Sequence, residues 1–244
     1  MASGIYTALS GAVAQSTALD VNANNIANAN TTGYHTVRAR FDEVLTRARS
    51  VDQRLVVPSG QTDDTAPGNI VPTGNPLDVA LQGDGYLAVL TPHGERFTRA
   101  GDLRLDSANQ LVTADGMPIE GINGKPLVVP PSTAKVVIAE SGLLTADGNE
   151  IGTIKLASFA PGVLKREGAT LYSPVLGPDN KPTAPLVVPP PKVLTGSLEH
   201  ANFSVVRGMV DLVKTSRTYE ALHRMIESYK EIDDRAARSI GGNG

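Results

Sequence analysis

The stretch LDVNANNIANANTTGY, residues 19–34, decides how the chain begins and is unusually rich in amide side chains. Five asparagines lie between Val21 and Thr31: Asn22, Asn24, Asn25, Asn28 and Asn30. Asparagine is a poor helix former because its side chain competes for backbone hydrogen bonds. The stretch nevertheless lies at the end of a helical pattern, so we expect these amides to be satisfied by groups that the local chain does not supply.

A heptad-like pattern leads into this stretch. Steps of four and three residues land on small or apolar side chains: Ile5, Leu9, Ala12, Ser16, Leu19, Ala23 and Ile26. The pattern predicts a helix from about residue 4 to about residue 30. Up to Thr32 the only charged side chain is Asp20, whereas a solvated helix normally carries charge on its free face. We therefore expect this helix to have neighbours all round.

A second long helix is predicted at the other end of the chain, from about residue 203 to about residue 239. Its apolar positions again follow steps of three or four residues: Val205, Met209, Leu212, Ser216, Tyr219, Leu222, Ile226 and Tyr229. Gly241 and Gly242 mark its end. Its free face is charged, so this helix can meet water or a polar partner.

Long helices with exposed apolar faces are not stable alone. The two terminal helices therefore pair with each other, or they pack into a bundle of several subunits. The nearly uncharged first helix favours the bundle, and a self-contained pair of helices within a monomer is the alternative.

The middle of the chain has a residue pattern different from that of the two terminal helices. Residues 34–71 are turn-rich and predict a linker, whereas short apolar runs broken by Gly, Pro, Asn or Asp follow from Leu77 and predict antiparallel strands. The fold class is therefore α+β. Residues 1–33 and 198–244 are predicted to pack as a coiled-coil-like helical domain, 34–71 to form a linker or extended segment, and 72–197 to form a central antiparallel all-β domain.

Composition excludes several classes of function. A net charge of −3 over 244 residues disfavours nucleic acid and anionic membranes as partners. The chain has no cysteine, so it has no disulfide. No apolar run approaches the roughly 20 residues that span a membrane, and the first residues do not resemble a cleaved signal peptide.

No motif predicts catalysis, a cofactor or a metal ion. The four histidines lack metal-ligand spacing, and the QGDGYL run lacks the third glycine of a dinucleotide fingerprint. Carboxylates such as Glu95, Asp102 and Asp106 are scattered, with no spacing that singles out a pair. We therefore predict that the protein is not an enzyme and has no cofactor.

Four blocks of the chain resemble bacterial flagellar rod, hook and related axial proteins. Residues 10–45 contain NNIANANTTGY, which is similar to the N-terminal signature of that family, and residues 196–226 resemble its C-terminal signature. Residues 76–89 and 97–121 are similar to its two β-domain motifs, with Asn109-Gln110 where the family usually has a turn glycine. The blocks occur in the family's order and span nearly the whole chain. Within the family the chain looks most like proximal rod proteins, and distal rod proteins are the next most similar.

The resemblance implies a structural subunit that assembles helically in the periplasm and transmits torque from the motor to the hook. Its implied partners are proximal rod subunits, the distal rod protein, further copies of itself and the flagellar type III export apparatus, which exports the family without cleavage. The alternatives are a distal rod or hook-basal homologue, or a secreted cell-wall hydrolase or glycan-binding protein. In a tube of packed subunits the amides would pair between subunits. The predicted assembly interface is then Ile5, Leu9, Leu19, Asn22, Asn24, Asn25, Ile26, Asn28, Val205, Met209, Leu212, Tyr219, Leu222 and Ile226.

Overall fold

The computed structural model describes residues 2–48, 51–131, 133, 135–177, 181–186, 189 and 191–241. The chain divides into two compact units. The helical unit consists of Met1–Ala27, Thr36–Thr65 and Phe203–Gly244. The β unit consists of Asn28–His35 and Ala66–Asn202. None of the helices described in the structure combines the length and the hydropathy that crossing a membrane requires.

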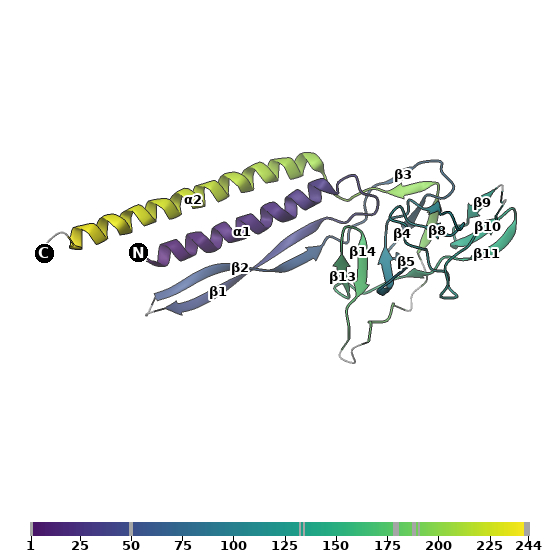
Figure 1. Cartoon of the computed structure of the whole chain (residues 1–244), viewed down its shortest axis with the longest axis horizontal. Helices are drawn as coiled ribbons and strands as arrows, with labels where there is room; N and C mark the ends of the chain where they lie inside the picture. The colour runs from purple at the N-terminus through teal and green to yellow at the C-terminus, as the bar shows by residue number, and fades with distance from the viewer. Residues whose placement is uncertain are drawn as a thin grey trace. The chain divides into compact units, whose positions relative to one another are not determined.

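Two antiparallel helices, α1 (Ala2–Ala27) and α2 (Val205–Gly241), form the main part of the helical unit (Figure 1). Their direction follows from contacts at the two ends, because Asn22 near the end of α1 donates to the carbonyl of Gly208 near the start of α2, and Gly4 lies beside Tyr229. The described residues confirm the two predicted terminal helices.

A β-hairpin completes the helical unit. Strands β1 (Val37–Ala48) and β2 (Val51–Asp63) pair antiparallel, with a shift in register between Arg40 and Phe41. Figure 1 shows α1 between α2 and this hairpin, and the backbone amide of Val56 donates to Ser10 Oγ of α1 at 3.4 Å. The segment expected to be a linker or extended segment, residues 34–71, contains extended strands that pair as a hairpin. Its charged residues obscure the strand pattern, and a two-stranded ribbon becomes stable only when it packs on another element.

The β unit is built from short antiparallel strands, as the sequence predicts for the centre of the chain. Its largest sheet has the order β12-β5-β6-β14-β13, beside a three-stranded sheet of order β11-β10-β9 and the pairs β15-β4, β16-β3 and β7-β8. The strands are β3 (Ile70–Pro72), β4 (Val79–Gln82), β5 (Tyr86–Thr91), β6 (Gly94–Thr98), β7 (Arg104–Leu105), β8 (Leu111–Val112), β9 (Val136–Ile138), β10 (Leu143–Ala146), β11 (Asn149–Thr153), β12 (Leu156–Ala157), β13 (Leu164–Glu167), β14 (Leu171–Pro174), β15 (Lys192–Thr195) and β16 (Ser197–Glu199).

The turns of the β unit use residues that tolerate a positive φ. The hairpin of β10 and β11 turns at Asp147 and Gly148, whose φ angles are 49° and 84°, and two successive positive φ values are typical of the type I′ turn. Asn109 precedes β8 with a φ of 58°. Asparagine reaches this left-handed region more readily than most residues, so Asn109 can stand where the family usually has a glycine.

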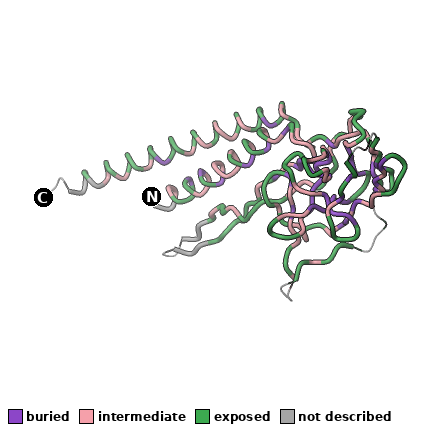
Figure 2. Tube along the Cα trace, turned by 45° about the vertical axis from the view of Figure 1, so that its right-hand side comes forward, coloured by how far each residue is buried: buried purple, intermediate pink, exposed green. Residues whose placement is uncertain are grey.

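The buried side chains of the structure lie mostly in the β unit (Figure 2). One cluster joins most of its strands and includes Leu87, Val89, Leu111, Leu144 and Val193. In the helical unit the corresponding cluster has only Ala8, Ala12 and Ile226 as fully buried members. The two units therefore differ strongly in how much apolar surface they bury.

Candidate assembly surface

Small residues of α1 face large residues of α2 where the helices meet. Ala8 and Ala12 are buried against Ile226, Tyr219 and Leu222. Glycine and alanine let two helices approach closely, and large side chains from the partner then fill the space above them.

This contact is rotated by about one residue from the face that the heptad pattern predicts. The predicted residues Ile5, Leu19 and Ile26 are half-buried, and Leu9 is 47% exposed. Ala12 belongs to both the predicted and the observed face, whereas Gly4, Ala8 and Gly11 of the observed contact lie outside the heptad pattern.

Three of the residues predicted on α2 pack against Ala8 and Ala12 of α1, namely Tyr219, Leu222 and Ile226. Ile226 is buried, and Val205, Leu212, Tyr219 and Leu222 are half-buried. Met209 is 54% exposed. Its neighbour Gly208 lies against α1 instead, where a Cβ atom would stand 3.2 Å from Cγ1 of Ile26.

Two of the predicted amides bind within the same chain. Asn25 is buried, and its side chain donates to the carbonyl of Val37 at 2.8 Å and accepts from the Val37 amide at 2.9 Å. Asn22 Nδ2 donates to the carbonyl of Gly208 at 2.8 Å. These partners lie outside the local helix but inside the subunit, so Asn25 joins the end of α1 to the start of β1 and Asn22 joins α1 to α2.

The other two amides of the predicted interface lie nearer to solvent. Asn24 is exposed, and Asn28, which belongs to the β unit, is half-buried beside the hydroxyl of Thr31 at 3.4 Å. A role for these two amides between subunits remains a prediction.

Exposed apolar side chains form two stripes on the helices. On α2 they recur at helical spacing over two turns, a set that we call the α2 stripe: Val206, Met209, Val210 and Val213. On α1 they are Tyr6, Leu9 and Val13, the α1 stripe. Contiguous exposed apolar residues of this kind mark interaction surfaces.

The heptad pattern of α2 does not separate the α2 stripe from the contact with α1. The signal was present, because Val206, Val210 and Val213 follow the i, i+4, i+7 pattern of a second apolar face. A single heptad register describes only one apolar face of a helix, so it does not reveal a second one.

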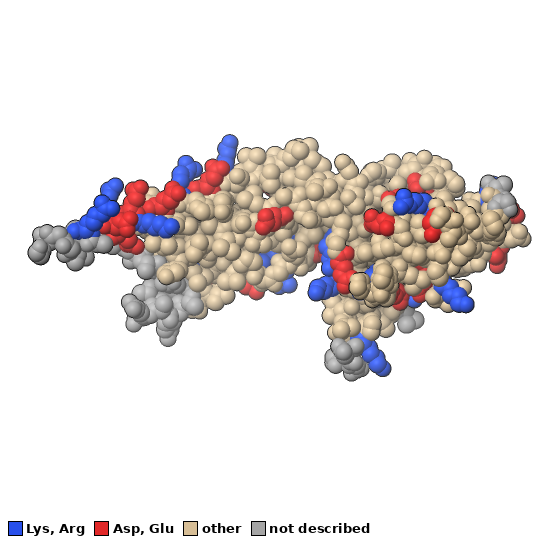
Figure 3. All heavy atoms as spheres, viewed as in Figure 1, with Lys and Arg blue, Asp and Glu red and all other residues tan. Residues whose placement is uncertain are grey.

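Charge is distributed unevenly along α2. On the face seen in Figure 3, the charged side chains of the helical unit gather over the C-terminal part of α2. Near the start of α2 the sequence has only Arg207 and Asp211 among apolar residues, whereas charges recur from Lys214 onward. The apolar stripe and the charged region thus divide the helix into two parts.

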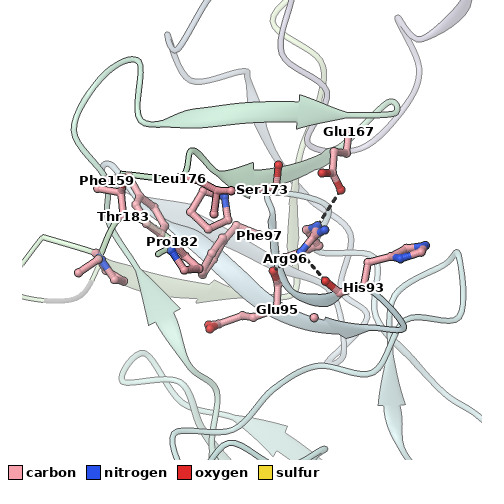
Figure 4. A pocket seen from close by; sticks show the side chains of 14 residues that line it. His93, Glu95, Arg96, Phe97, Phe159, Glu167, Ser173, Leu176, Pro182 and Thr183 are labelled. Carbon is pink, nitrogen blue, oxygen red and sulfur yellow. Dashed lines mark hydrogen bonds and ion pairs between the residues drawn. The ribbon is translucent and has the colours of Figure 1, made fainter. Parts of the chain in front are cut away.

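The β unit has a pocket of about 480 Å³ between β6 and the segment that follows β14 (Figure 4). Phe97 and Phe159 line it with their rings in edge-to-face contact at 4.6 Å. At its rim Arg96 Nε donates to Glu167 at 2.7 Å, and Arg96 Nη1 donates to the carbonyl of His93.

The carboxylates of this pocket are paired with cations. The hydrogen bond from Arg96, helped by one from Ser173, lowers the pKa of Glu167, and Glu95 lies 2.6 Å from Lys155 Nζ. A glycosidase needs one carboxyl with a raised pKa as its general acid. The pairing with Arg96 lowers the pKa of Glu167 instead. Among the described residues no group of three His, Asp or Glu side chains is arranged to hold a metal ion.

Comparison with known proteins matches both ends and the middle of the chain to flagellar families. Residues 5–35 match the model for flagella basal body rod proteins, residues 80–146 match the D1 domain of the flagellar hook protein FlgE/F/G, and residues 194–239 match the C-terminal region of flagellar basal body rod FlgEFG proteins. The terminal matches fall on α1 and α2, and the central match falls in the β unit.

Whole-length relatives agree with these matches. The chain is 33% identical to the flagellar basal-body rod protein FlgF of Escherichia coli (strain K12) over 248 residues, which cover 96% of each chain. It is 27% identical to FlgF of Rhizobium meliloti (strain 1021) over 252 residues and 100% of each chain. It is 32% identical to FlgG of Agrobacterium fabrum (strain C58 / ATCC 33970) over 266 residues, 96% of this chain and 97% of FlgG. The chain belongs to the family of flagellar basal-body rod proteins that includes FlgF and FlgG.

Proposed function

We propose that this chain is a structural subunit of the flagellar basal-body rod, and that it joins its neighbours through the helical unit. The observation that carries the proposal is the α2 stripe, together with an α1 that has Asp20 as its only charged residue. In a folded chain such a surface is costly to leave in water, and packing among other subunits removes that cost. The subunit then transmits motor torque as part of a rigid shaft.

Within the rod we place this subunit in the proximal part. Support comes from alignment length, because 248 positions suffice to align the chain with FlgF of Escherichia coli, whereas alignment with FlgG of Agrobacterium fabrum needs 266 for the same 96% of this chain. The alignment with FlgG therefore contains more gaps than the alignment with FlgF. A distal position, as for FlgG, is the alternative.

The finer features of assembly belong to the same proposal. The helical unit packs in a coiled-coil-like manner with neighbouring rod subunits and further copies of this chain. The flagellar export apparatus delivers the chain to the periplasmic space without cleavage, and the β unit has no catalytic role. Family membership supports these features.

Charge placed on the α2 stripe tests the proposal. In a flagellated host that lacks its own copy of the gene, Val206→Glu combined with Val210→Glu should abolish swimming and remove the subunit from purified basal bodies. Both residues are exposed, so the melting temperature of the purified chain should change by no more than about 2 °C.

The matched control changes two exposed residues of α2 outside the stripe, Lys214→Glu with Arg217→Glu. This control should swim and assemble as the unchanged chain does. Normal swimming and rod incorporation by the double valine variant would refute the proposed use of the α2 stripe.

A further inference from the structure

A buried ionic cluster lies inside the β unit, and we call it the clasp: Glu199, Arg99 and His35. Glu199 is 1% exposed, Arg99 is 4% exposed and His35 is 2% exposed. Arg99 Nη1 donates to Glu199 Oε2 at 3.0 Å, and His35 Nε2 lies 3.3 Å from Glu199 Oε1. Burial would by itself raise the pKa of Glu199, but the hydrogen bond with His35, the charge of Arg99 and the Gly68 amide together hold that pKa below its ordinary value.

The clasp gathers the segments through which the chain passes between its two units. The chain enters or leaves the β unit at residues 28 and 35, at residue 66 and at residue 202. Glu199 Oε1 accepts from the Gly68 amide at 2.9 Å, and the Glu199 carbonyl accepts from the Gly33 amide at 2.8 Å. One residue therefore bonds to His35 and Gly33 of the first segment and to Gly68 of the second, and it belongs itself to the strand that leads into the third.

Further hydrogen bonds join the same segments. The Asn202 amide donates to the carbonyl of Tyr34 at 3.3 Å, and Asn202 Nδ2 donates to the carbonyl of Ala66 at 2.8 Å. The His200 amide donates to the carbonyl of Asn69 at 2.9 Å. The segment 199–202 is thus joined to both of the others near the points where the chain leaves the β unit.

Two glycines permit these close approaches. A Cβ atom on Gly68 would lie 1.7 Å from the carbonyl oxygen of His200, and one on Gly33 would lie 2.3 Å from the carbonyl carbon of Arg99. Gly33 also has a φ of 66°, in the left-handed region. Close contact between these backbone segments therefore requires glycine at both positions.

A buried ion pair is a weak source of stability, because removing two charges from water costs about as much as their attraction returns. The clasp is also incompletely satisfied, since the buried atoms His35 Nδ1 and Arg99 Nε have no hydrogen-bond partner among the described residues. The large apolar cluster of the β unit already supplies a core. The clasp instead specifies which segments meet, because Glu199 holds His35, Gly33 and Gly68 at hydrogen-bond distance.

We propose that Glu199 is a positioning residue: by holding segments 28–35, 66–69 and 199–202 together, it fixes the path along which the chain leaves the β unit toward both terminal helices. The clasp does this in the free chain, before any assembly. Losing it should loosen the connecting segments and leave the β core intact.

Hydrogen exchange of the full chain tests the local part of the proposal. In Glu199→Gln the amides of Gly33, Gly68 and Asn202 should exchange at least about tenfold faster. The amides of Ala88 and Leu90, which donate to Lys155 and Pro118 in the core, should keep their rates. The matched control is Glu167→Gln, which removes an exposed Glu–Arg pair of the same unit and should alter none of these amides.

Unchanged clasp amides in Glu199→Gln would overturn the proposal, and so would an equal acceleration at Ala88 and Leu90, since Glu199 would then support the whole unit. If Glu199→Gln fails to fold, His35→Phe decides by the same two results. This variant keeps a ring and removes one of the two partners of Glu199 Oε1, leaving the Gly68 amide.

Distances between spin labels test the positioning itself. The chain has no native cysteine, so labels can be placed at Asn30→Cys in the first connecting segment and Glu150→Cys in β11, both exposed sites of the β unit. Glu199→Gln should widen the distribution of distances between the labels, whereas Glu167→Gln should not. A distribution of equal width with and without Glu199 would overturn the proposal.

Discussion

Single amides and glycines determine how the segments of this chain meet. Asn25 illustrates why the asparagine-rich stretch tolerates poor helix formers: its side chain replaces a backbone partner for both the amide and the carbonyl of Val37. Asn22 donates an additional hydrogen bond to the Gly208 carbonyl in the first turn of α2, and so joins the two helices. The side chains that weaken the helix locally therefore satisfy buried backbone groups of distant segments.

Removal of the Asn25 side chain should be costly for this reason. Asn25→Ala leaves the amide and the carbonyl of Val37 without their partner, and the free energy of unfolding should fall by about 2 to 4 kcal/mol. Asn30→Ala, at an exposed position of the same stretch, should change it by less than about 0.5 kcal/mol. Urea unfolding measures both, and equal effects of the two substitutions would contradict the assigned role of Asn25.

Asp102 should make stability depend on pH in a defined direction. Burial, opposed by a backbone hydrogen bond and reinforced by the charges of Asp115 and Asp78, raises the pKa of Asp102 above its ordinary value of 3.8. The folded state then favours the protonated carboxyl, so this group's contribution to stability is present below pH 3.8 and is lost as the pH rises through the folded pKa.

Asp102→Asn removes this titration. The variant should be more stable than the unchanged chain at neutral pH, and the difference should shrink as the pH falls toward 3.8. Urea midpoints of the two chains, measured as a function of pH, give the comparison. A constant difference at all pH values would contradict the assignment to Asp102.

At the scale of elements, the sequence was sufficient to predict both helices and the antiparallel strands of the centre. Each of these predictions depends on apolar residues that repeat at short intervals along the chain. The sequence predicted only part of the face of α1 that meets α2, because the heptad pattern includes Ala12 but not Ala8. Glycine and alanine carry little hydrophobic signal, yet Ala8 and Ala12 occupy the contact. The hairpin of β1 and β2 was missed for a related reason, since its pairing depends on packing beside α1 rather than on a clear alternation.

The same helix contact predicts opposite effects for two glycines. Replacing glycine by alanine inside a helix normally stabilises it by up to about 1 kcal/mol. A Cβ on Gly11 would meet only the methyl groups of the Leu222 side chain, at 3.3 Å and 3.6 Å, whereas one on Gly208 would lie 2.3 Å from the ring of Phe203. Gly11→Ala should therefore be neutral or stabilising.

Gly208→Ala should instead lower the free energy of unfolding by about 1 to 3 kcal/mol, because the Phe203 ring must leave its place. Thermal and urea unfolding of the two single variants measure the contrast. Stabilisation by Gly208→Ala would show that the helices do not approach closely at this point.

At the scale of the whole molecule, the two units hold unequal amounts of buried apolar surface. The β unit has a large cluster of fully buried Leu, Ile and Val side chains, whereas two of the three fully buried members of the helical cluster are alanines. The helical unit also leaves large side chains such as Val206 and Tyr6 more than half exposed. Hydrophobic content alone does not show this imbalance, because half of the apolar residues of α1 are alanines, which bury little surface.

The free chain should therefore open in order, helical unit first. Helices gain most of their stability from tertiary packing, and regions with few buried apolar contacts open at lower free energy. Hydrogen exchange of dilute chain should show α1 and α2 at least about tenfold less protected than β5 and β10. In assembled rods the helices should become as protected as those strands, because neighbouring subunits then cover the α1 and α2 stripes. If the helices of the dilute chain were as protected as the β unit, the self-contained pair of helices would be the correct description, and assembly would add contacts without adding order.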